Sequence, residues 1–275
     1  MQVAVVVLRM CPIMNEQMAY ALITGASSGI GRHLACELAA RGLDVVLVAR
    51  NDPALQELRL EIEARHRVRA TVIGVDLSVP GAAADLYTEL RRTQPAPDVL
   101  VNNAGFGSYG LFHEADGEVL QRLVQVNILA LTCLLRRVLP EMRARGSGRI
   151  LNVASCAAFN AGPLMAVYFA TKAYVLHLSE AVSQECVGSG VTVTALCPGA
   201  TATEFHRTAG FPENSWLFAP PVAARPAAVA RYGIRALYAG RRIAIPGLAN
   251  KLSILALRVV PRRIAVVLAQ RVLKH

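Results

Sequence analysis

The sequence predicts an α/β protein in which helices cover both faces of a doubly wound parallel sheet, in a single domain with a basic helical appendage at its C-terminal end. Short runs of apolar, β-branched residues alternate with longer amphipathic runs over most of the chain. The short runs are apolar at successive positions, which is typical of strands buried on both faces. No internal repeat and no Gly/Ser-rich linker divides the 275 residues, of which 54% are hydrophobic, so one large core is expected.

Six strands with five intervening helices account for residues 19–196. The predicted strands are Ala19–Thr24, Val45–Ala49, Ala70–Val75, Val99–Asn102, Arg149–Ala154 and Val191–Leu196. The predicted helices are Gly31–Arg41, Pro53–Arg65, Ala82–Arg92, Glu118–Arg145 and Val167–Val187. Right-handed crossovers then bring the carboxyl ends of the strands to one edge of the sheet, where ligands bind in such folds. The main body is expected to span residues 19–204, followed by a lid and a helix over 205–242 and a tail over 243–275.

The charge is concentrated in the last quarter of the chain. Residues 1–204 carry 17 Lys and Arg against 18 Asp and Glu, whereas residues 205–275 carry 12 against 1. In the tail, Lys251, Arg258 and Arg262 recur at spacings of seven and four, which predicts one basic face of an amphipathic helix. Such a helix could lie on an anionic membrane surface, or pack on a subunit with its arginines in solvent. No motif supports nucleic-acid binding.

The sequence contains no stretch that we expect to span a membrane. The longest uncharged run, 150–171, contains Asn, Ser, Gly and Pro residues that suit a soluble turn. Residues 1–18 are expected to be a disordered extension. The six cysteines lack C-x-x-C spacing and His partners, so no metal site is predicted and reduced thiols are expected. We expect a cytoplasmic protein, with peripheral contact at the inner membrane surface as the alternative for the tail.

A glycine-rich loop follows the first predicted strand. Residues Thr24–Gly31 read Thr-Gly-Ala-Ser-Ser-Gly-Ile-Gly and lead into a helix. Glycines permit a tight turn and let backbone N–H groups approach a phosphate, to which the helix N-terminus adds partial positive charge. Many turns are glycine-rich, but the position between a strand and a helix favours a phosphate site.

The ends of the second and third strands bear on the choice of cofactor. Rossmann-type folds usually carry an acid at the end of the second strand, where it binds a ribose 2′-hydroxyl, whereas this chain has Arg50. Asp44 lies at the opposite end of that strand, and Asp52 could cap the next helix. An arginine favours a 2′-phosphate and therefore NADP(H) over NAD(H); the alternative is a solvated arginine. Asp76 could accept a hydrogen bond from an adenine amino group or cap a turn.

Four polar residues form a candidate catalytic set. Tyr168 and Lys172 are four residues apart on one predicted helix, so both point to the same side. A nearby ammonium lowers the pKa of a phenol from its usual value near 10, which makes the phenol a usable general acid and base. Ser155 ends the fifth strand, where its hydroxyl could bond a carbonyl oxygen. Asn127 lies within a long apolar helix, where an amide is structural unless it joins a relay.

Together these motifs resemble the short-chain dehydrogenase/reductase superfamily over roughly residues 19–203. The matching residues are Thr24–Gly31, Asn102–Gly105, Asn127, Ser155, Tyr168, Lys172, Pro198, Gly199, Thr201 and Thr203. The resemblance implies an oxidoreductase acting on CH–OH and C=O groups with a nicotinamide cofactor. Tyr168 would exchange a proton with the substrate oxygen, and Lys172 would lower the tyrosine pKa and hold the nicotinamide ribose. Ser155 would orient the carbonyl, and Asn127 would position a water in a proton relay.

The resemblance also implies a set of cofactor-binding residues. They are Gly25, Ser27, Ser28, Gly29, Ile30, Gly31, Arg50, Asp76, Leu77, Asn103, Ala104, Gly105, Tyr168, Lys172, Pro198, Gly199, Thr201 and Thr203. Two positions depart from the usual pattern. Ala154 replaces a second serine found in many relatives, and Ser28 stands where many NADP-dependent relatives carry a basic residue. Arg50 is therefore the main expected determinant for the 2′-phosphate of NADP(H).

The segment after Thr203 is expected to cover the site and carries five large apolar residues: Phe205, Phe211, Trp216, Leu217 and Phe218. With Phe106, Tyr109, Phe159, Leu164 and Met165, they suggest a lipophilic ketone or aldehyde as substrate, unless the aromatics only pack the lid. The expected substrate-binding residues are Ser155, Phe159, Tyr168 and Phe205. By the same resemblance a homodimer or homotetramer is expected. The alternative function is a catalytically silent NADP(H)-binding protein with a regulatory or membrane-surface role.

Overall fold

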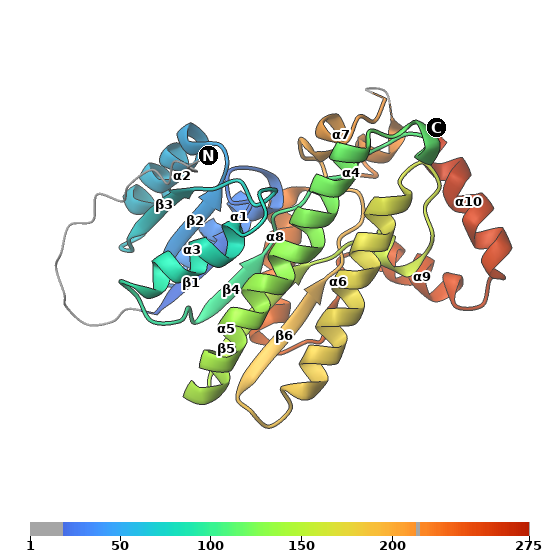
Figure 1. The fold of residues 1–275 in the computed structure, drawn as a ribbon. Helices are drawn as coiled ribbons and strands as arrows, with labels where there is room; N and C mark the ends of the chain where they lie inside the picture. Colours follow the sequence, from blue (N-terminus) through green and yellow to red (C-terminus); the bar gives the residue numbers. More distant parts are fainter. Residues whose placement is uncertain (1–18, 213–214, 275) are drawn as a thin grey trace.

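A computed structural model describes residues 19–212 and 215–274 of the chain and contains one sheet of seven parallel strands in the order β3-β2-β1-β4-β5-β6-β7 (Figure 1). The strands are β1 (Tyr20–Thr24), β2 (Asp44–Ala49), β3 (Ala70–Gly74), β4 (Val99–Asn102), β5 (Gly148–Val153), β6 (Val191–Leu196) and β7 (Ile243–Ala244). The chain order reverses between β1 and β4, which creates the switch point at which ligands bind in open α/β sheets.

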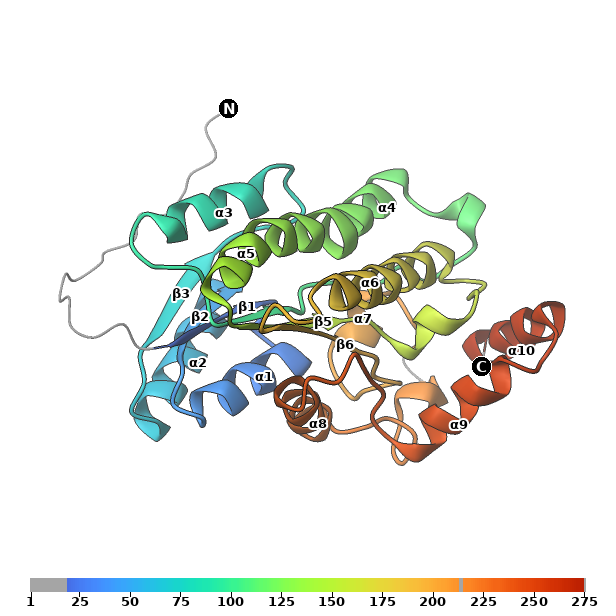
Figure 2. The same cartoon turned by 90° about the horizontal axis from the view of Figure 1, so that it is seen from below.

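Helices cover both faces of the sheet, as Figure 2 shows. The helices on one face are α3 (Ala82–Arg91), α4 (Gly117–Val124), α5 (Leu131–Arg145) and α6 (Ala166–Glu185), and those on the other are α1 (Gly29–Ala39), α2 (Asp52–Arg65) and α8 (Pro226–Tyr238). A short helix α7 (Phe205–Thr208) follows β6, and α9 (Leu248–Leu257) and α10 (Arg262–Lys274) end the chain. Every residue of β1 is buried, which explains the unbroken apolar pattern of the strand.

The predicted fold class is confirmed, and the predicted elements within residues 19–196 have bounds that agree with the structure to within two residues. The helix after β1 begins at Gly29 rather than at Gly31. The long helix predicted from Glu118 contains a π-helical segment, Gln125–Ala130, between α4 and α5. β7 was not predicted, because two residues are too few for a periodicity to be recognised. The extension predicted for residues 1–18 lies outside the described residues.

The C-terminal tail differs from the single basic helix that the sequence predicts. α9 ends at Leu257 with Arg258 as its C-cap, and α10 begins only at Arg262. Lys251 and Arg262 therefore lie on different helices, and the predicted common face is wrong. Pro261 accounts for the break, since proline has no N–H to donate to the preceding turn and disfavours helical geometry at the residue before it.

One helix in the described part of the chain, Gly117–Arg145, has the length and hydropathy of a membrane-spanning segment. This helix comprises α4, the π-helical segment and α5. Several of its buried side chains, among them Leu134, Val138 and Met142, belong to the apolar cluster that packs on this face of the sheet. The hydropathy therefore matches the helix's role in the core.

Buried polar side chains tie the middle of the sheet to α6. The amide of Asn102 on β4 donates to the Asn152 side-chain oxygen at 2.9 Å, and the Asn152 amide donates to the Ser179 hydroxyl at 2.9 Å. Ser179 in turn donates to the carbonyl of Val175, one helical turn earlier. All three side chains are buried. This chain of hydrogen bonds fixes α6 against β4 and β5.

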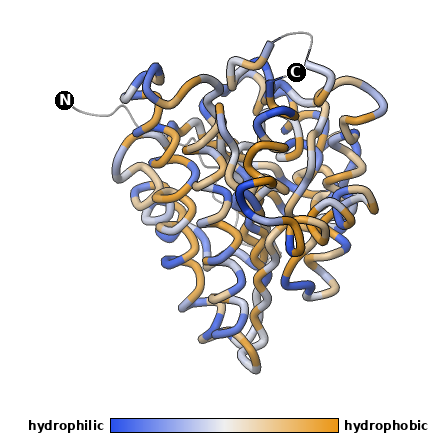
Figure 3. Tube along the Cα trace, turned by 90° about the vertical axis from the view of Figure 1, so that its right-hand side faces the viewer, coloured by the Kyte–Doolittle hydropathy of each residue, from blue (hydrophilic) through white to orange (hydrophobic). Residues whose placement is uncertain are grey.

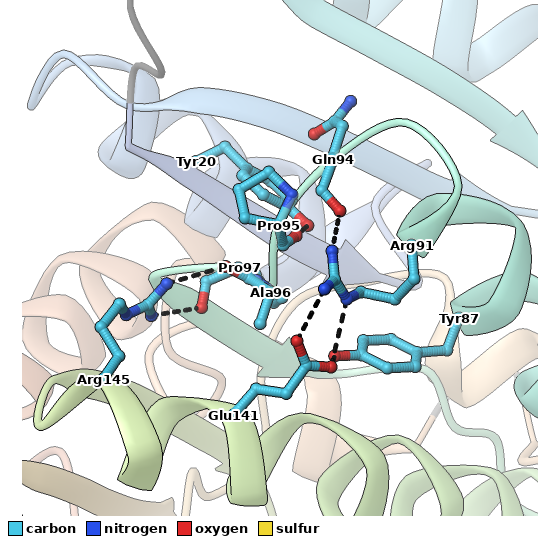
Figure 4. Close-up of polar contacts among 9 residues, drawn as sticks. All are labelled: Tyr20, Tyr87, Arg91, Gln94, Pro95, Ala96, Pro97, Glu141 and Arg145. Atoms are coloured by element: carbon cyan, nitrogen blue, oxygen red, sulfur yellow. Dashed lines mark hydrogen bonds and ion pairs between the residues drawn. The ribbon is translucent and has the colours of Figure 1, made fainter.

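The opposite edge of the sheet, at the amino ends of the strands, is braced by the contacts drawn in Figure 4. Glu141 on α5 accepts hydrogen bonds from the Tyr87 hydroxyl at 2.6 Å and from Arg91 Nε at 3.1 Å. Arg145 donates to the carbonyls of Ala96 and Pro97, both at 2.9 Å. These contacts hold the segment that leads into β4. Because they occupy the amino edge of the sheet, a ligand site is expected at the carboxyl edge.

Candidate active site

The glycine-rich loop lies at the carboxyl end of β1, and two of its glycines leave no space for a side chain. A methyl group on Gly31 would lie 2.1 Å from the carbonyl oxygen of Gly25. Gly25 has a φ of +65°, and a methyl group there would lie 2.7 Å from the Asn103 amide nitrogen. The loop is therefore a close-packed turn in which the backbone itself forms the surface.

Hydrogen bonds from the end of β4 hold this loop in place. The Thr24 hydroxyl accepts from the backbone N–H groups of Asn103 and Ala104, each at 3.0 Å. The Asn103 side-chain amide donates to the carbonyls of Thr24 and Gly25, also at 3.0 Å. These contacts occupy the Asn103 amide and hold the loop against the end of β4, while a contact of Asn103 with the cofactor stays a prediction.

The surroundings of the loop fit a dinucleotide. Ser28 is exposed at the N-cap of α1 and makes no capping hydrogen bond through its side chain. Gly29, with a φ of +54°, lies against Thr203, so the loop after β6 meets the loop after β1. Arg50 and Asp76 are exposed at the same edge, just after β2 and β3. Polar side chains, the N-terminus of α1 and a closely packed backbone turn thus lie along the carboxyl edge of the sheet.

Some predicted cofactor residues have other surroundings. Leu77 is buried in the core, so only its backbone could face a ligand. The carboxylate of Asp76 accepts a hydrogen bond from the Ser78 backbone N–H at 2.9 Å. This contact is the one expected if Asp76 caps a turn. The cap of α2 is Asn51, whose side chain accepts from Ala54 N–H, rather than Asp52.

Tyr168 and Lys172 lie on one side of α6, near the end of β5. The Lys172 ammonium is 5.8 Å from the centre of the Tyr168 ring and donates a hydrogen bond to the carbonyl of Val153 at 2.8 Å. Only 6% of Lys172 is exposed. The Ser155 hydroxyl, just after β5, accepts from Ala157 N–H at 3.1 Å and donates to the Pro198 carbonyl at 3.4 Å. The structure therefore brings Ser155, Tyr168 and Lys172 together at the end of β5.

Burial dominates the protonation of Tyr168 and Lys172. It raises the pKa of Tyr168 to about 12, although hydrogen bonding with Ser155 acts in the opposite direction. Burial lowers the pKa of Lys172 to about 8. The pKa of Tyr168 was expected to fall, but in the protein alone it rises, because desolvation of the phenolate outweighs the lowering effect of the hydrogen bond with Ser155.

The lowered pKa of Lys172 should make the stability of the protein depend on pH, and a variant without this lysine can isolate its contribution. Its pKa is about 8 in the folded state against an ordinary 10.5. Between these values the unfolded chain binds more protons, so the free energy of unfolding rises with pH. The unfolding free energy of the wild-type protein minus that of Lys172→Met should therefore increase by about 2–3 kcal/mol from about pH 7 to about pH 10. Urea titrations at both pH values measure it, and a constant difference would contradict the lowered pKa.

Asn127 lies in the π-helical segment, where one residue beyond the regular α-helical spacing is accommodated. Its side-chain oxygen accepts from Phe106 N–H at 3.1 Å, and its amide donates to the Phe106 carbonyl and the Thr171 hydroxyl, both at 3.0 Å. The side chain thus links the loop after β4, which contains Phe106, to α6 beside Lys172. A role in holding a water stays a prediction.

An apolar cluster covers the outer side of Tyr168. The Phe205 ring lies 5.1 Å from the Tyr168 ring, centre to centre, and the Tyr109 and Phe211 ring centres lie 4.6 Å apart with the planes tilted by 35°. The other members of the cluster are Leu164, Met165, Phe169, Ala209, Leu217, Phe218 and Leu273. Phe159 and Phe106 pack in two different clusters, so this arrangement does not place the predicted substrate residue Phe159 with Tyr168.

Sequence reasoning missed the contribution of α10 to this site. The Tyr109 hydroxyl donates to the carbonyl of Leu273 at 2.9 Å, and the Asn160 amide donates to the carbonyl of Ala265 at 3.1 Å. No local pattern could have indicated these contacts, since the partners are more than 100 residues apart.

The cysteines and other potential ligands do not form a metal centre in the described part of the chain. All five described cysteines are free thiols, and no group of three His, Cys, Asp or Glu side chains within 19–212 and 215–274 could hold an ion. Cys156, next to Ser155, donates through Sγ to the Cys197 carbonyl at 3.4 Å. Burial raises the pKa of Cys156 to about 12, which keeps this thiol protonated.

Comparison with known proteins places this site in a family. The sequence profile for short chain dehydrogenases matches residues 19–213. A very-long-chain 3-oxoacyl-CoA reductase from Caenorhabditis elegans is 37% identical over 212 residues, 73% of this chain and 66% of that protein. The human inactive hydroxysteroid dehydrogenase-like protein 1 is 33% identical over 220 residues, 78% of this chain and 66% of that protein. The chain thus spans about two thirds of the length of these curated relatives.

A solved structure shares most of the fold. The short-chain dehydrogenase from Sphingobium yanoikuyae in complex with NADPH has a TM-score of 0.78 and 33% sequence identity, covering 87% of this chain and 92% of its own. The matched profile, the identities and the common fold show that this chain belongs to the short-chain dehydrogenase family of oxidoreductases, whose members bind NAD(H) or NADP(H).

Proposed function

We propose that this protein is an NADP(H)-dependent oxidoreductase that interconverts a lipophilic ketone or aldehyde and its alcohol, with Tyr168 as general acid and base. The observation that carries the proposal is the placement of Tyr168. The polar side chains of Lys172 and Ser155 lie on one side of its ring, and the apolar cluster that contains Phe205 lies on the other. A proton donor at the boundary of polar and apolar surfaces suits a substrate with one reacting oxygen and an otherwise apolar body.

The proton chemistry follows from these side chains. In the direction of reduction, the Tyr168 hydroxyl donates its proton to the carbonyl oxygen as that oxygen gains negative charge. The Ser155 hydroxyl donates a hydrogen bond to the same oxygen. A nicotinamide cofactor, when bound, would supply the hydride for the carbonyl carbon, or accept it in the reverse direction. The Lys172 ammonium stabilises the tyrosine phenolate that remains.

Several residues would hold the dinucleotide. The Thr24–Gly31 loop and the N-terminus of α1 would hold the phosphates, and Thr203 packs against Gly29. Lys172 gives one N–H to the Val153 carbonyl and keeps two for ribose hydroxyls. The NADPH bound by the Sphingobium relative supports this reading.

Arg50 should determine the preference for NADP(H). The side chain is exposed at the end of β2, and none of the described residues forms an ion pair with it. Arg50→Ala should weaken NADPH binding about 10- to 100-fold, the value of a charge-assisted bond to phosphate, and leave NADH binding unchanged. Fluorescence titration with both cofactors measures the effect, and Arg67→Ala, which removes a similarly exposed charge, is the control. If Arg50→Ala weakened the binding of NADPH and NADH equally, Arg50 would not determine the preference for NADP(H).

The alternative is a catalytically silent NADP(H)-binding protein. Its support is the 33% identity to the human relative named inactive, together with the raised pKa of Tyr168. Following NADPH oxidation with ketones and aldehydes of increasing chain length separates the two functions. The proposed enzyme turns over substrates with a preference that grows with chain length, whereas tight NADPH binding with no turnover across the panel would establish the silent protein.

The expected homodimer or homotetramer remains a separate proposal. Leu129 is half exposed on the outer face of the π-helical segment, and the neighbouring Thr132 hydroxyl pairs with that of Tyr174 on α6 at 3.0 Å. This outer face suits a subunit contact. Light scattering of the purified chain distinguishes a monomer from either oligomer.

A further inference from the structure

The last two helices have an unusual distribution of apolar side chains. On α9 only Ile254 is buried, and on α10 only Ala265 and Leu273. The exposed large apolar side chains on and beside these helices are Leu248, Leu252, Leu255, Val259, Ile264, Val267, Leu268 and Val272. Leu248 is 72% exposed and Val259 83%. Figure 3 views the molecule from the side on which these helices lie, and apolar and polar residues alternate along them. We refer to this set as the tail face.

The spacing of the exposed residues places them on one side of each of the two helices. Leu248, Leu252 and Leu255 are separated by four and three residues, which puts them on one side of α9, and Val259 follows directly after the C-cap Arg258. Ile264, Leu268 and Val272 follow at intervals of four on α10. An exposed apolar surface of this extent is rare on a monomeric soluble protein and marks an interaction site.

The charges around the tail face indicate the chemistry of its partner. Six cations lie on or beside the two helices: Lys251, Arg258, Arg262, Arg263, Arg271 and Lys274. All are exposed, and no Asp or Glu occurs in residues 215–274. A second copy docked through this surface would bring the same cations together, which opposes association. An anionic bilayer offers both an apolar phase for the leucines and valines and negative headgroups for the cations.

The inner side of the same helices touches the active site. Asn250 on α9 lies where a side chain on Gly199 would have to be, in the predicted cofactor loop. On α10, Leu273 belongs to the apolar cluster over Tyr168 and accepts the hydrogen bond from Tyr109. Figure 2 shows α9 and α10 projecting beyond the sheet on the side away from α2 and α3. A surface bound to the outer side of these helices is therefore separated from the substrate cluster by one layer of helix.

We propose that α9 and α10 dock on an anionic membrane surface and that the lipophilic substrate reaches Tyr168 from that membrane past the inner side of α10. The docking part stands on the tail face alone, whereas the substrate route rests on the proposed function. Docking is reversible, since both helices lie in the interface rather than across it and the attraction weakens with salt.

Vesicle binding of the full chain tests the docking. The probes are vesicles of phosphatidylcholine alone and of phosphatidylcholine with about one third phosphatidylglycerol. The wild-type chain should bind the anionic vesicles at least about tenfold more tightly, and this difference should shrink at high salt. Leu252→Ser with Leu255→Ser, and separately Arg262→Gln with Arg263→Gln, should each weaken anionic binding about tenfold or more.

Matched variants control for general effects on the surface. Leu60→Ser with Val187→Ser removes two similarly exposed apolar residues far from the tail face, and Arg136→Gln with Arg137→Gln removes an exposed arginine pair on α5. Both should bind as the wild type does, with unchanged thermal unfolding in every variant. Failure of the wild type to bind either vesicle overturns the docking. The docking is also overturned if the wild type is a dimer and the double substitution Leu252→Ser with Leu255→Ser dissociates it, because the tail face would then be a subunit interface.

Activity measurements then test the substrate route. Turnover of a long-chain ketone supplied in anionic vesicles should fall about tenfold in Leu252→Ser with Leu255→Ser, while kcat/KM for a short, water-soluble ketone stays unchanged. Equal turnover of the vesicle-borne ketone overturns the route while leaving docking intact. If no ketone is reduced by any form of the protein, the proposed function fails, and the vesicle binding still decides the docking.

Discussion

Tyr168→Phe should reduce turnover of any carbonyl substrate by about 10²- to 10⁴-fold, because the phenylalanine cannot donate a proton to the developing alkoxide. Binding of NADPH should change by no more than about threefold, since the ring stays in place against Phe205 and only the hydroxyl is lost. Stopped-flow measurement of NADPH oxidation, with titration of the cofactor in parallel, separates the two effects.

A second tyrosine on the same helix provides the control. Tyr174 is also on α6, but its hydroxyl pairs with Thr132 on α5, away from the carboxyl edge of the sheet. Tyr174→Phe should retain full turnover. If Tyr168→Phe kept more than about a tenth of the wild-type rate, Tyr168 would not be the proton donor and the catalytic proposal would fail.

Gly31→Ala should abolish tight dinucleotide binding and destabilise the fold. The new methyl group would lie 2.1 Å from the Gly25 carbonyl oxygen and 2.4 Å from the Asn103 amide nitrogen, and the first of these belongs to the backbone. Since the backbone cannot rotate away as a flexible side chain can, the loop must shift. We expect a loss of about 1–3 kcal/mol in the free energy of unfolding and at least a roughly hundredfold weaker affinity for NADPH.

Gly117→Ala is the matched substitution, because a methyl group at Gly117 would meet no atom within 4 Å. This variant should keep the wild-type affinity and stability, or gain slightly from the better helix propensity of alanine. Urea unfolding and NADPH titration of both variants give the comparison. Wild-type affinity in Gly31→Ala would show that the loop can open without cost and that its close packing is irrelevant to binding.

Features that depend on neighbours in the sequence could be predicted well. The strands Val99–Asn102 and Val191–Leu196 have the bounds expected from their apolar runs. Tyr168 and Lys172 come together with Ser155 because helical spacing and the end of a parallel strand bring them to the same edge.

Features that depend on burial or distant contacts could not be predicted from the sequence. The pKa of Tyr168 was expected to fall because the pattern shows a neighbouring charge, whereas the loss of solvation depends on what covers the ring. The contact of Leu273 with Tyr109 joins the last helix to the loop after β4, and no periodicity encodes it. The break at Pro261 could have been foreseen from the residue itself, since proline ends helices for a local reason.

The π-helical segment Gln125–Ala130 also sets the phase of the long helix. One residue of α-helix corresponds to a rotation of about 100°, so an extra residue turns everything after it by that angle. Asn127 in the π-helical segment bonds Phe106 and Thr171, whereas α5 presents Leu134, Val138 and Met142 to the sheet. With a regular α-helix, these two orientations could not both be satisfied: either the amide would leave Phe106 or the apolar stripe would leave the core. The extra residue therefore allows one continuous helix to make both contacts: the hydrogen bonds of Asn127 with Phe106 and the packing of α5 on the sheet.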